Sequence, residues 1–209
     1  MIFLIRRKDY TYNLTLIFYI FIVLSNKESQ SNKKLKPYKQ KLSVKFLRIT
    51  WFFVWCLLFR FTPPPFFNFW RVFLLKLFGA NIQWSSKIYP SVKIFEPWNL
   101  KIGKNSLIGS NVDCYNYDKI VIGENATISQ NVFLCTASRN YKSKNFNIIT
   151  ESISIENKVW IAANCFVAPG VILKKGSVLL AGSNLYQNTR ENFIYMGSPA
   201  KIKKKRKYK

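Results

Sequence analysis

The 209-residue sequence contains no histidine and no pair of cysteines spaced as CxxC. Zinc sites are built mostly from histidine and cysteine at short spacings, so the sequence argues against a zinc site and predicts no metal ligands. The absence of histidine also removes the side chain that most often acts as a general base near neutral pH. The four cysteines are interpreted as free thiols in a reducing compartment. They are Cys56, Cys114, Cys135 and Cys165.

Acidic residues are scarce, because only 9 Asp and Glu accompany 33 Lys and Arg, which gives a formal net charge of +24. Such a balance favours polyanionic partners, whether nucleic acid, anionic lipid or phosphorylated ligands. The plainer interpretation is a lysine-rich chain with solvated basic faces. No helix-turn-helix, zinc-finger or RNA-recognition motif is present, so charge alone supports nucleic-acid binding and we expect no nucleic-acid partner.

Aliphatic side chains recur at every sixth position. A strand repeats about every two residues and a helix about every 3.6, so neither explains this spacing. A chain that turns a corner after each short strand does explain it, and the sequence therefore predicts an all-β core, a β-helix of hexapeptide repeats. The alternative is a β-sandwich with a chance period. The series are Ile155, Ile161, Val167, Leu173, Leu179 and Leu185; Ile88, Ile94 and Leu100; Ile102, Ile108, Cys114 and Ile120; and, after a slip of two residues, Ile122, Ile128 and Leu134.

The repeat region is expected to span residues 81–200. Its aliphatic series stops at Leu134 and resumes at Ile155, which predicts that residues 135–154 leave the coil as an extruded loop. Cys135 opens this loop and is a candidate reactive thiol, although a structural role is the plainer expectation. Residues 201–209 form a polybasic tail that we expect to be disordered.

The N-terminal residues divide into two parts before the repeats. Residues 1–41 are an apolar extension followed by a lysine-rich linker, and the apolar run 14–24 is shorter than the roughly 20 residues that cross a bilayer. Either a peripheral anchor or an upstream start codon would explain it. Residues 42–80 are predicted to form an amphipathic, aromatic helical hairpin, interrupted at Pro63–Pro65 and ended by Gly79. Its tryptophans and flanking cations suit a membrane interface, or the helices cover the open end of the β-helix.

From about residue 40 to 201 the chain resembles the hexapeptide-repeat O-acetyltransferases, most nearly those of the colanic-acid type in bacterial exopolysaccharide synthesis. The resemblance implies a left-handed parallel β-helix, a homotrimer, and acetyl-CoA bound between neighbouring coils as co-substrate. It implies a saccharide acceptor, either free or lipid-linked, and a cytoplasmic enzyme, at most peripheral to the inner face of the membrane. The matching segments are Phe73–Ala80, Tyr89–Ser91, Pro97–Leu100, Val112–Asn116, Leu134–Ser138, Val159–Ala162 and Gly197–Lys201.

In this family one histidine follows a Thr-Ala-Ser-like run and takes the proton from the sugar hydroxyl, while backbone N–H groups stabilise the oxyanion. Here Arg139 follows Cys135–Ser138, and Asn140 comes next. An arginine stays protonated, so Arg139 cannot be a general base. It could hold an anionic sugar, a phosphate of CoA or the developing oxyanion. The nearby titratable alternatives are Asp118 and Tyr141.

The resemblance assigns the other site residues by position. Asn116 and Trp160 correspond to residues that contact the acceptor or line the pantetheine channel, although both also suit purely structural roles in the coil. The family's usual Thr-Lys is replaced here by Tyr186 and Gln187, which puts the phosphate contacts in doubt. The residues matching the family's CoA-binding positions are Ala162, Ala163, Ala181, Gly182, Ser183 and Lys201.

The resemblance therefore predicts an acetyl-CoA-dependent O-acetyltransferase that acts on a sugar hydroxyl in surface-polysaccharide synthesis. The missing histidine leaves three possibilities for its chemistry: slow or substrate-assisted catalysis, a different base, or none. The alternative is a catalytically silent relative that binds CoA or saccharide, or an assembly protein.

Overall fold

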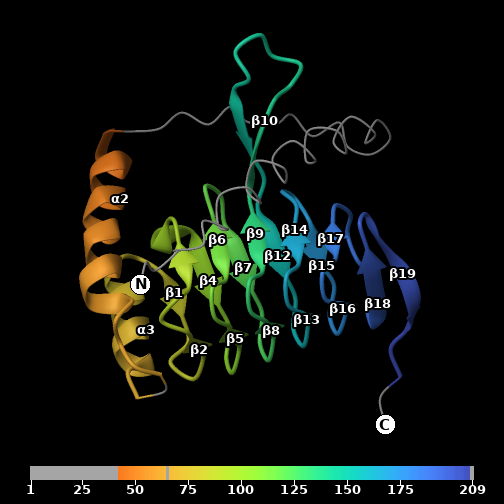
Figure 1. The fold of residues 1–209 in the computed structure, drawn as a ribbon, viewed down its shortest axis with the longest axis horizontal. Helices are drawn as coiled ribbons and strands as arrows, with labels where there is room; N and C mark the ends of the chain where they lie inside the picture. Colours follow the sequence, from red (N-terminus) through yellow and green to blue (C-terminus); the bar gives the residue numbers. More distant parts are fainter. Residues whose placement is uncertain (1–41, 65, 208–209) are drawn as a thin grey trace, which may run out of the picture.

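The computed structural model describes residues 42–64 and 66–207. This part of the chain is a solenoid of short parallel strands, with two helices at one end and a hairpin projecting from its side (Figure 1). The predicted extension and linker at 1–41, and the last two residues of the predicted tail, lie outside the described residues.

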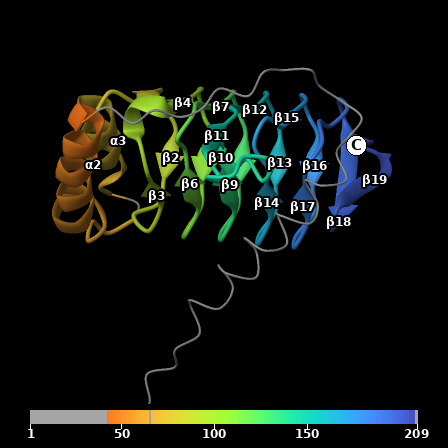
Figure 2. The same cartoon turned by 90° about the horizontal axis from the view of Figure 1, so that it is seen from above.

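Successive strands belong to three sheets in rotation, so each coil of the solenoid has three sides (Figure 2). The first sheet contains β1 (Asn81–Ile82), β4 (Leu100–Ile102), β7 (Ile120–Ile122), β12 (Ile153–Ile155) and β15 (Ile172–Leu173). The second contains β2 (Lys87–Ile88), β5 (Leu107–Ile108), β8 (Thr127–Ile128), β13 (Trp160–Ile161), β16 (Val178–Leu179), β18 (Phe193–Gly197) and β19 (Ala200–Lys205). The third contains β3 (Lys93–Ile94), β6 (Asp113–Tyr115), β9 (Phe133–Cys135), β14 (Phe166–Val167) and β17 (Asn184–Leu185).

The predicted aliphatic series form the core. On each sheet one inward residue per strand stacks on its counterpart in the next coil, and all of these side chains are buried. The hexapeptide β-helix expected from the sequence is therefore confirmed. The first column is Ile82, Ile102, Ile122, Ile155 and Leu173. The second is Ile88, Ile108, Ile128, Ile161, Leu179 and Tyr195. The third is Ile94, Cys114, Leu134, Val167 and Leu185.

The two-residue slip in the sequence pattern has a structural cause on the first sheet. Strands β4, β7 and β12 have three residues each, with the first and last both buried. Leu100, Ile120 and Ile153 are paired in register and form an additional inward column. The inward positions of the third and first sheets are therefore eight residues apart here, as from Ile94 to Ile102 and from Cys114 to Ile122, rather than six.

The corners of the coils are often made by asparagine in the left-handed region of backbone conformation. Asparagine adopts this conformation more readily than other residues with a side chain, because its short polar group bonds locally. The corner residues Asn105, Asn111, Asn125, Asn131 and Asn164 have φ of 54°, 57°, 53°, 56° and 58°.

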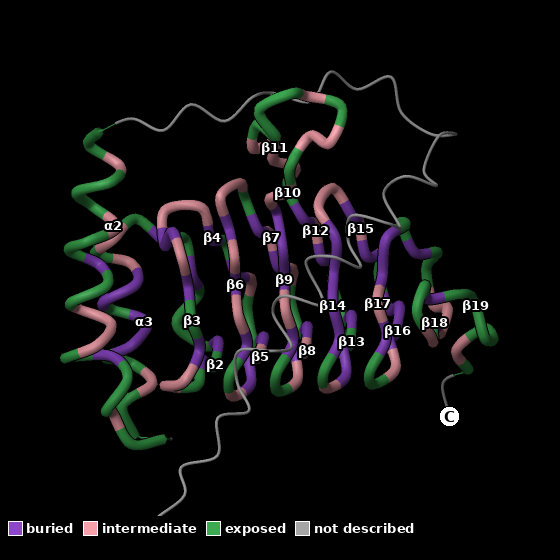
Figure 3. The backbone as a smooth tube through the Cα atoms, turned by 45° about the horizontal axis from the view of Figure 1, so that its top comes forward, coloured by how far each residue is buried: buried purple, intermediate pink, exposed green. Residues whose placement is uncertain are grey.

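The helical cap, defined here as residues 42–64 and 66–78, covers the first coil. It consists of α2 (Leu42–Val54), a π-helical turn η1 (Trp55–Phe59) and α3 (Asn68–Leu77). The indole Nε1 atoms of Trp51 and Trp55 donate to the carbonyl oxygens of Ile94 and Val92, both at 2.7 Å. Through these contacts the inner face of the helices packs on the open end of the solenoid (Figure 3).

A buried ion pair fixes α2 to the first coil. The guanidinium of Arg48 donates to the carboxylate of Glu96, whose side chain is only 2% exposed. Trp98 Nε1 and Asn99 Nδ2 also donate to Glu96, at 3.0 and 2.6 Å. These two residues belong to the 3₁₀ turn η2 (Pro97–Asn99) that leads into β4. Breaking such a pair by removing one partner typically costs about 3–5 kcal/mol.

The basic C-terminal segment is more ordered than the sequence suggested. Ala200–Lys205 forms β19, which pairs antiparallel with β18, Tyr195 lying opposite Ile202. The expectation of disorder is thus wrong for 201–205, because this strand satisfies the exposed edge of β18.

The hairpin leaves the coil between β9 and β12. It contains β10 (Ala137–Arg139) and β11 (Ile148–Thr150), paired antiparallel with Arg139 opposite Ile148. Cys135 still belongs to β9 and Ile153–Ile155 are back in the coil. The excursion therefore spans 136–152, slightly less than the range 135–154 expected from the sequence.

The asparagine corners yield a stability prediction. Asn131 is exposed, with φ of 56°, so Asn131→Val should lower the free energy of unfolding by about 1–2 kcal/mol, because a β-branched side chain is strained in this conformation. Asn131→Gly should change the free energy of unfolding by much less. Urea denaturation followed by circular dichroism measures both; equal losses would show that the side chain matters rather than the backbone.

Candidate functional site

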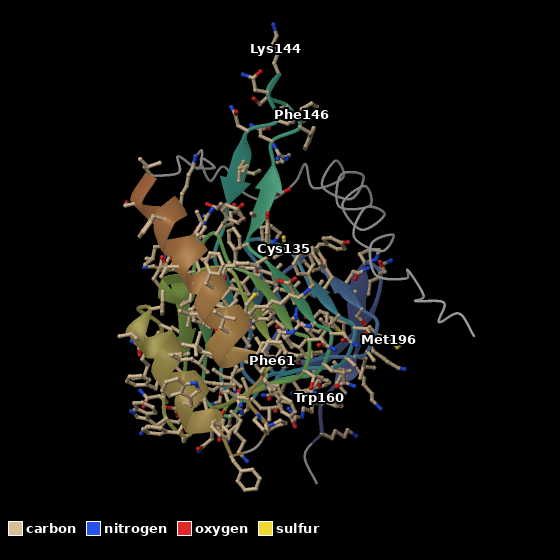
Figure 4. All side chains as sticks on the ribbon, turned by 60° about the vertical axis from the view of Figure 1, so that its left-hand side comes forward. Phe61, Cys135, Lys144, Phe146, Trp160 and Met196 are labelled. Carbon is tan, nitrogen blue, oxygen red and sulfur yellow. The ribbon has the colours of Figure 1, made fainter. Side chains whose placement is uncertain are left out.

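The hairpin with the predicted catalytic position projects from the corner between the third and first sheets. In Figure 4 Lys144 and Phe146 lie towards its tip and Cys135 lies at its base. Arg139 is the last residue of β10 and is exposed; its Nη1 donates to the carbonyl oxygen of Phe146 at 3.1 Å. Asn140 begins the turn, where its backbone N–H donates to the Asn147 carbonyl and its Oδ1 accepts from the Lys142 N–H. Arg139 is thus presented to solvent, and Asn140 shapes the turn.

Two residues at the base of the hairpin escaped the sequence reasoning. Asp113 and Tyr115 flank the inward Cys114 on β6, so both point outwards towards the hairpin side of the coil. Alternation about Cys114 was the signal that would have found them. Burial raises the pKa of Asp113 above its usual range, and Lys93 only partly opposes this effect. Burial and the hydrogen bond with Tyr117 raise the pKa of Tyr115, while the charge of Arg139 acts in the opposite direction.

Cys135 is not a reactive thiol in this arrangement. Its side chain is buried, and its Sγ donates to the Ala137 carbonyl at 3.1 Å. Burial raises the pKa of the thiol to about 11, so the thiolate is scarce at neutral pH.

Asp118, one of the two alternative bases, lies beside the hairpin. Its backbone N–H donates to Oγ1 of Thr136, the first residue of the excursion, at 3.0 Å. Its own Oδ1 accepts from the Lys119 N–H at 2.7 Å. Tyr141 lies further out on the hairpin turn, where Lys142 stacks 5.8 Å from the centre of its ring. The described part of the hairpin base therefore offers three carboxylates, Asp113, Asp118 and Glu151, the last of which donates its backbone N–H to the Thr136 carbonyl at 2.9 Å.

Asn116 has a structural role as placed. Its side chain is fully buried, its Oδ1 accepts from the N–H groups of Phe95 and Glu96 at 3.1 and 3.0 Å, and its Nδ2 donates to the Glu96 carbonyl. These hydrogen bonds join two successive coils and leave no polar atom of Asn116 for a ligand. Contact with the acceptor is still only a prediction, and it would require these bonds to break.

Trp160 lies on the outer surface of the second sheet beside an open cavity of about 560 Å³. Its indole is 44% exposed, and Nε1 donates to Ser129 Oγ at 3.1 Å. The cavity has apolar walls and two cations. Its lining residues are Asn125, Thr127, Lys158, Val159, Trp160 and Arg206. Arg206 donates to the Gly176 carbonyl at 3.1 Å, which fixes its side chain at this end of the cavity.

The small residues assigned to CoA gather near Trp160. Ala162 follows Trp160 by two positions but is buried, at 6% exposure, and Ala163 lies at the next corner, where its carbonyl accepts from the Gly182 N–H at 2.9 Å. No heavy atom lies within 4 Å of where a Cβ on Gly182 would stand, and Ala181 beside it is exposed. The surface is therefore open to a ligand lying close to the backbone.

Ser183 and Lys201 are placed differently from these small residues. Ser183 is buried and its Oγ accepts from the Gly197 N–H at 3.1 Å, which is a structural role. Lys201 is exposed on β19 opposite Met196.

The predicted site residues fall into two groups on opposite sides of the solenoid. Arg139 projects from the corner between the third and first sheets, whereas Trp160 lies on the second sheet. In a three-sided coil that corner faces away from the second sheet, and Figure 4 shows Trp160 far from the hairpin. One chain alone therefore supplies a cavity with cations and, separately, an arginine on a projecting arm.

Comparison with known proteins gives the family of this architecture. A family model described as the hexapeptide repeat of succinyl-transferase matches residues 99–135. The chain is 38% identical over 156 residues to a protein described as a colanic acid biosynthesis acetyltransferase, WcaF, of Escherichia coli K12, covering 75% of this chain and 85% of WcaF.

Solved structures agree with the sequence comparison. A hexapeptide-repeat acetyltransferase from Vibrio cholerae superposes with a TM-score of 0.73 at 25% identity, covering 85% of this chain and 100% of that one. The same enzyme in complex with acetyl-CoA gives a TM-score of 0.73 at 24% identity, over 84% and 97% of the two chains. The fold is the left-handed parallel β-helix, and the chain belongs to the hexapeptide-repeat acetyltransferases.

Proposed function

We propose that this acetyltransferase uses acetyl-CoA to O-acetylate a sugar hydroxyl during the synthesis of a surface polysaccharide. The observation that carries the proposal is the 38% identity to WcaF, a protein named for colanic acid biosynthesis, over 75% of the chain. The galactoside O-acetyltransferase of Escherichia coli K12, 27% identical over 135 residues, also acts on a sugar by its name.

The surface beside Trp160 supports acetyl-CoA as the acyl donor. Pantetheine is slender and partly apolar, which suits a course along the small residues Ala162, Ala163 and Gly182. Lys158 and Arg206 line the cavity and supply positive charge for the phosphates. Bound acetyl-CoA would supply an activated thioester carbonyl, which the acceptor oxygen attacks as the thiolate of CoA leaves.

A homotrimer would complete the site. The arm carrying Arg139 and the cavity at Trp160 lie on opposite sides of one chain, so an arm from a neighbouring copy must reach the cavity of the first. In a ring of three copies, the arm of each chain would reach the cavity of the next. Such a head-to-tail contact forms a closed ring in which every arm and every cavity is paired.

Arg139 would contribute charge rather than accept a proton. Its guanidinium stays protonated, and only Nη1 is needed for the hydrogen bond to the Phe146 carbonyl. It would therefore orient an anionic acceptor or stabilise the oxyanion of the tetrahedral intermediate. The proton of the acceptor hydroxyl would pass to a carboxylate at the hairpin base, for which the raised pKa of Asp113 is better suited than an ordinary aspartate.

The reaction would take place in the cytoplasm, where acetyl-CoA is made, and close to the inner face of the membrane if the acceptor is lipid-linked. The strong positive charge of the chain, +24, suits such an anionic surface.

The second candidate function is a catalytically silent relative that binds CoA or saccharide, or serves in assembly. The absence of histidine from the whole sequence is the specific observation in its favour. Losing a general base typically costs about 10²–10⁴-fold in rate, so a chain retained for binding alone would keep the cavity and lose turnover.

Calorimetric titration with acetyl-CoA tests the donor site. The wild type should bind, and Trp160→Ala should weaken binding about tenfold or more because it removes an exposed wall of the cavity. Trp84→Ala is the matched control, since Trp84 is 46% exposed and lies at the other end of the solenoid. No binding by the wild type would defeat both candidate functions.

Arg139→His tests whether the missing base limits the rate. Thiol release from acetyl-CoA in the presence of a sugar acceptor should rise by about 10²-fold or more in this variant, because histidine restores a base at neutral pH. Arg139→Lys, which keeps the charge without the base, should give no gain. Loss of an existing activity in Arg139→His would instead show that the guanidinium itself is required.

Any turnover by the wild type should depend on pH through Asp113. The carboxylate must be ionised to accept a proton, so the rate should rise with pH through a pKa that lies above the usual value for aspartate. Asp113→Asn should remove this rise and lower the rate, whereas Asp118→Asn should keep the rise. A pH profile unchanged by Asp113→Asn would exclude Asp113 as the base.

A further inference from the structure

The outer face of the helical cap is a continuous apolar surface that the solenoid leaves uncovered. On α2 and η1, side chains at spacings of four, three, four and four residues share one side of the helix. This side is opposite Trp51, which packs on the coil and is 3% exposed. The outer stripe, as we call it, consists of Leu42, Phe46, Ile49, Phe53 and Leu57, with exposures of 80%, 73%, 56%, 57% and 69%.

Both the turn between the helices and α3 expose further apolar side chains, although Phe69 on α3 stacks on Trp84 with ring centres 4.6 Å apart. Phe61 and Phe66 in the turn are 78% and 87% exposed, and Phe69 and Leu77 on α3 are 67% and 68% exposed. Trp70 joins the two helices, because its Nε1 donates to the Leu58 carbonyl at 3.0 Å. Monomeric soluble proteins rarely expose so large an apolar area unless it contacts a partner or a membrane.

The charges around this surface are all of one sign. Residues 42–80 contain the cations Lys45, Arg48, Arg60, Arg71 and Lys76 and not one Asp or Glu. Arg48 and Arg71 face inwards, where Arg48 pairs with Glu96 and Arg71 donates to the Ile88 carbonyl at 2.7 Å. Lys45 and Arg60 are exposed at the borders of the stripe. The partner of such a surface must be apolar at its centre and negative at its margin.

We propose that the outer face of the helical cap docks on the surface of an anionic lipid bilayer, with the outer stripe in the acyl boundary and the cations at the headgroups. Aromatic and basic residues of this kind are typical of helices that lie in the membrane interface. Two caps packed face to face would oppose like charges with no carboxylate to neutralise them, which disfavours a second copy as the occupant.

The same helix lies on the membrane rather than across it. Leu42–Phe59 is 18 residues long with a mean hydropathy of 1.7, and by length and composition alone it could span a bilayer. However, Trp51, Trp55 and Arg48 bind its inner face to the first coil at the carbonyl of Ile94, the carbonyl of Val92 and the carboxylate of Glu96. Spanning would expose these polar groups to hydrocarbon, so the fold holds the helix in the interfacial position.

This docking would set the height of the active site above the membrane, a consequence that depends on the proposed function. The hairpin leaves the third coil, two intervals of roughly 4.8 Å beyond the first, and a helix is about 10 Å across. Arg139 would therefore stand on the order of 20 Å from the lipid headgroups. That distance suits a saccharide attached to a membrane lipid through a phosphate, which Arg139 and the basic surroundings would also attract.

Vesicle flotation of the full chain tests the docking without relying on catalysis. The wild type should float with vesicles of phosphatidylcholine and phosphatidylglycerol at 7:3 and not with phosphatidylcholine alone. The triple variant Phe46→Gln, Phe53→Gln, Leu57→Gln keeps every charge and should bind the anionic vesicles at least tenfold more weakly.

The matched control is Met196→Gln with Ile202→Gln, which replaces exposed apolar side chains of 47% and 43% exposure at the far end of the solenoid. It should bind like the wild type, and all three proteins should show the same circular dichroism spectrum and melting temperature.

Wild-type binding by the triple variant, or no binding by the wild type, would overturn the proposal. The proposal would also be overturned if sedimentation showed that the triple substitution changes only the oligomeric state, because a second copy of the chain would then cover the outer stripe. Acetyl-CoA titration of the triple variant should match the wild type, which separates this result from failure of the proposed function.

Discussion

The whole molecule depends on one packing constraint, namely that each side of each coil places at least one side chain, usually aliphatic, in the interior. A coil with three short sides has room for little more, so the inward residues stack in columns from Ile82 to Leu173, Ile88 to Tyr195 and Ile94 to Leu185. The corners must then turn within a few residues, which asparagine in the left-handed conformation permits. Because the inward positions are fixed, their neighbours must face outwards, and these outward residues are all that the fold can offer to ligands.

This geometry explains why the candidate site is divided. Trp160 on β13 faces outwards from the second sheet, and the hairpin can leave only at a corner, where the backbone turns without breaking a column. It leaves between the third and first sheets, so Arg139 and Trp160 lie on opposite sides of the coil. Under the proposed function, an isolated chain would hold the two halves of the site apart, and a neighbouring copy would have to bring them together.

The sequence predicted what the packing constraint determines and missed what depends on contacts across the coils. The period of six located the core and the hairpin, because each aliphatic residue is individually required, whereas the family resemblance singled out Arg139 within the hairpin. The same period could not show that Cys135 stays in β9. The end of that strand is set by its pairing with Tyr115 in the neighbouring coil, which the spacing of residues does not reveal. Nor could it show that Asn116 binds the backbone of Phe95 and Glu96, because this contact joins residues about twenty positions apart. The strand at 200–205 was missed because the edge of β18 stabilises it, whereas its own composition of lysines suggests disorder.

The helical cap and the hairpin base are connected by the same buried contacts. The Arg48 guanidinium lies over the rings of Phe95 and Tyr117, 4.4 and 4.7 Å from their centres, and pairs with Glu96. The ring centres of Tyr117 and Tyr115 are 4.9 Å apart, and the positive charge of Arg139 acts to lower the pKa of the Tyr115 phenol, which burial raises. A charge buried among aromatic rings holds its neighbours to one arrangement, because leaving it unpaired is costly. A continuous series of contacts therefore joins the inner side of α2 to the base of the hairpin, from Arg48 through Tyr117 to Tyr115.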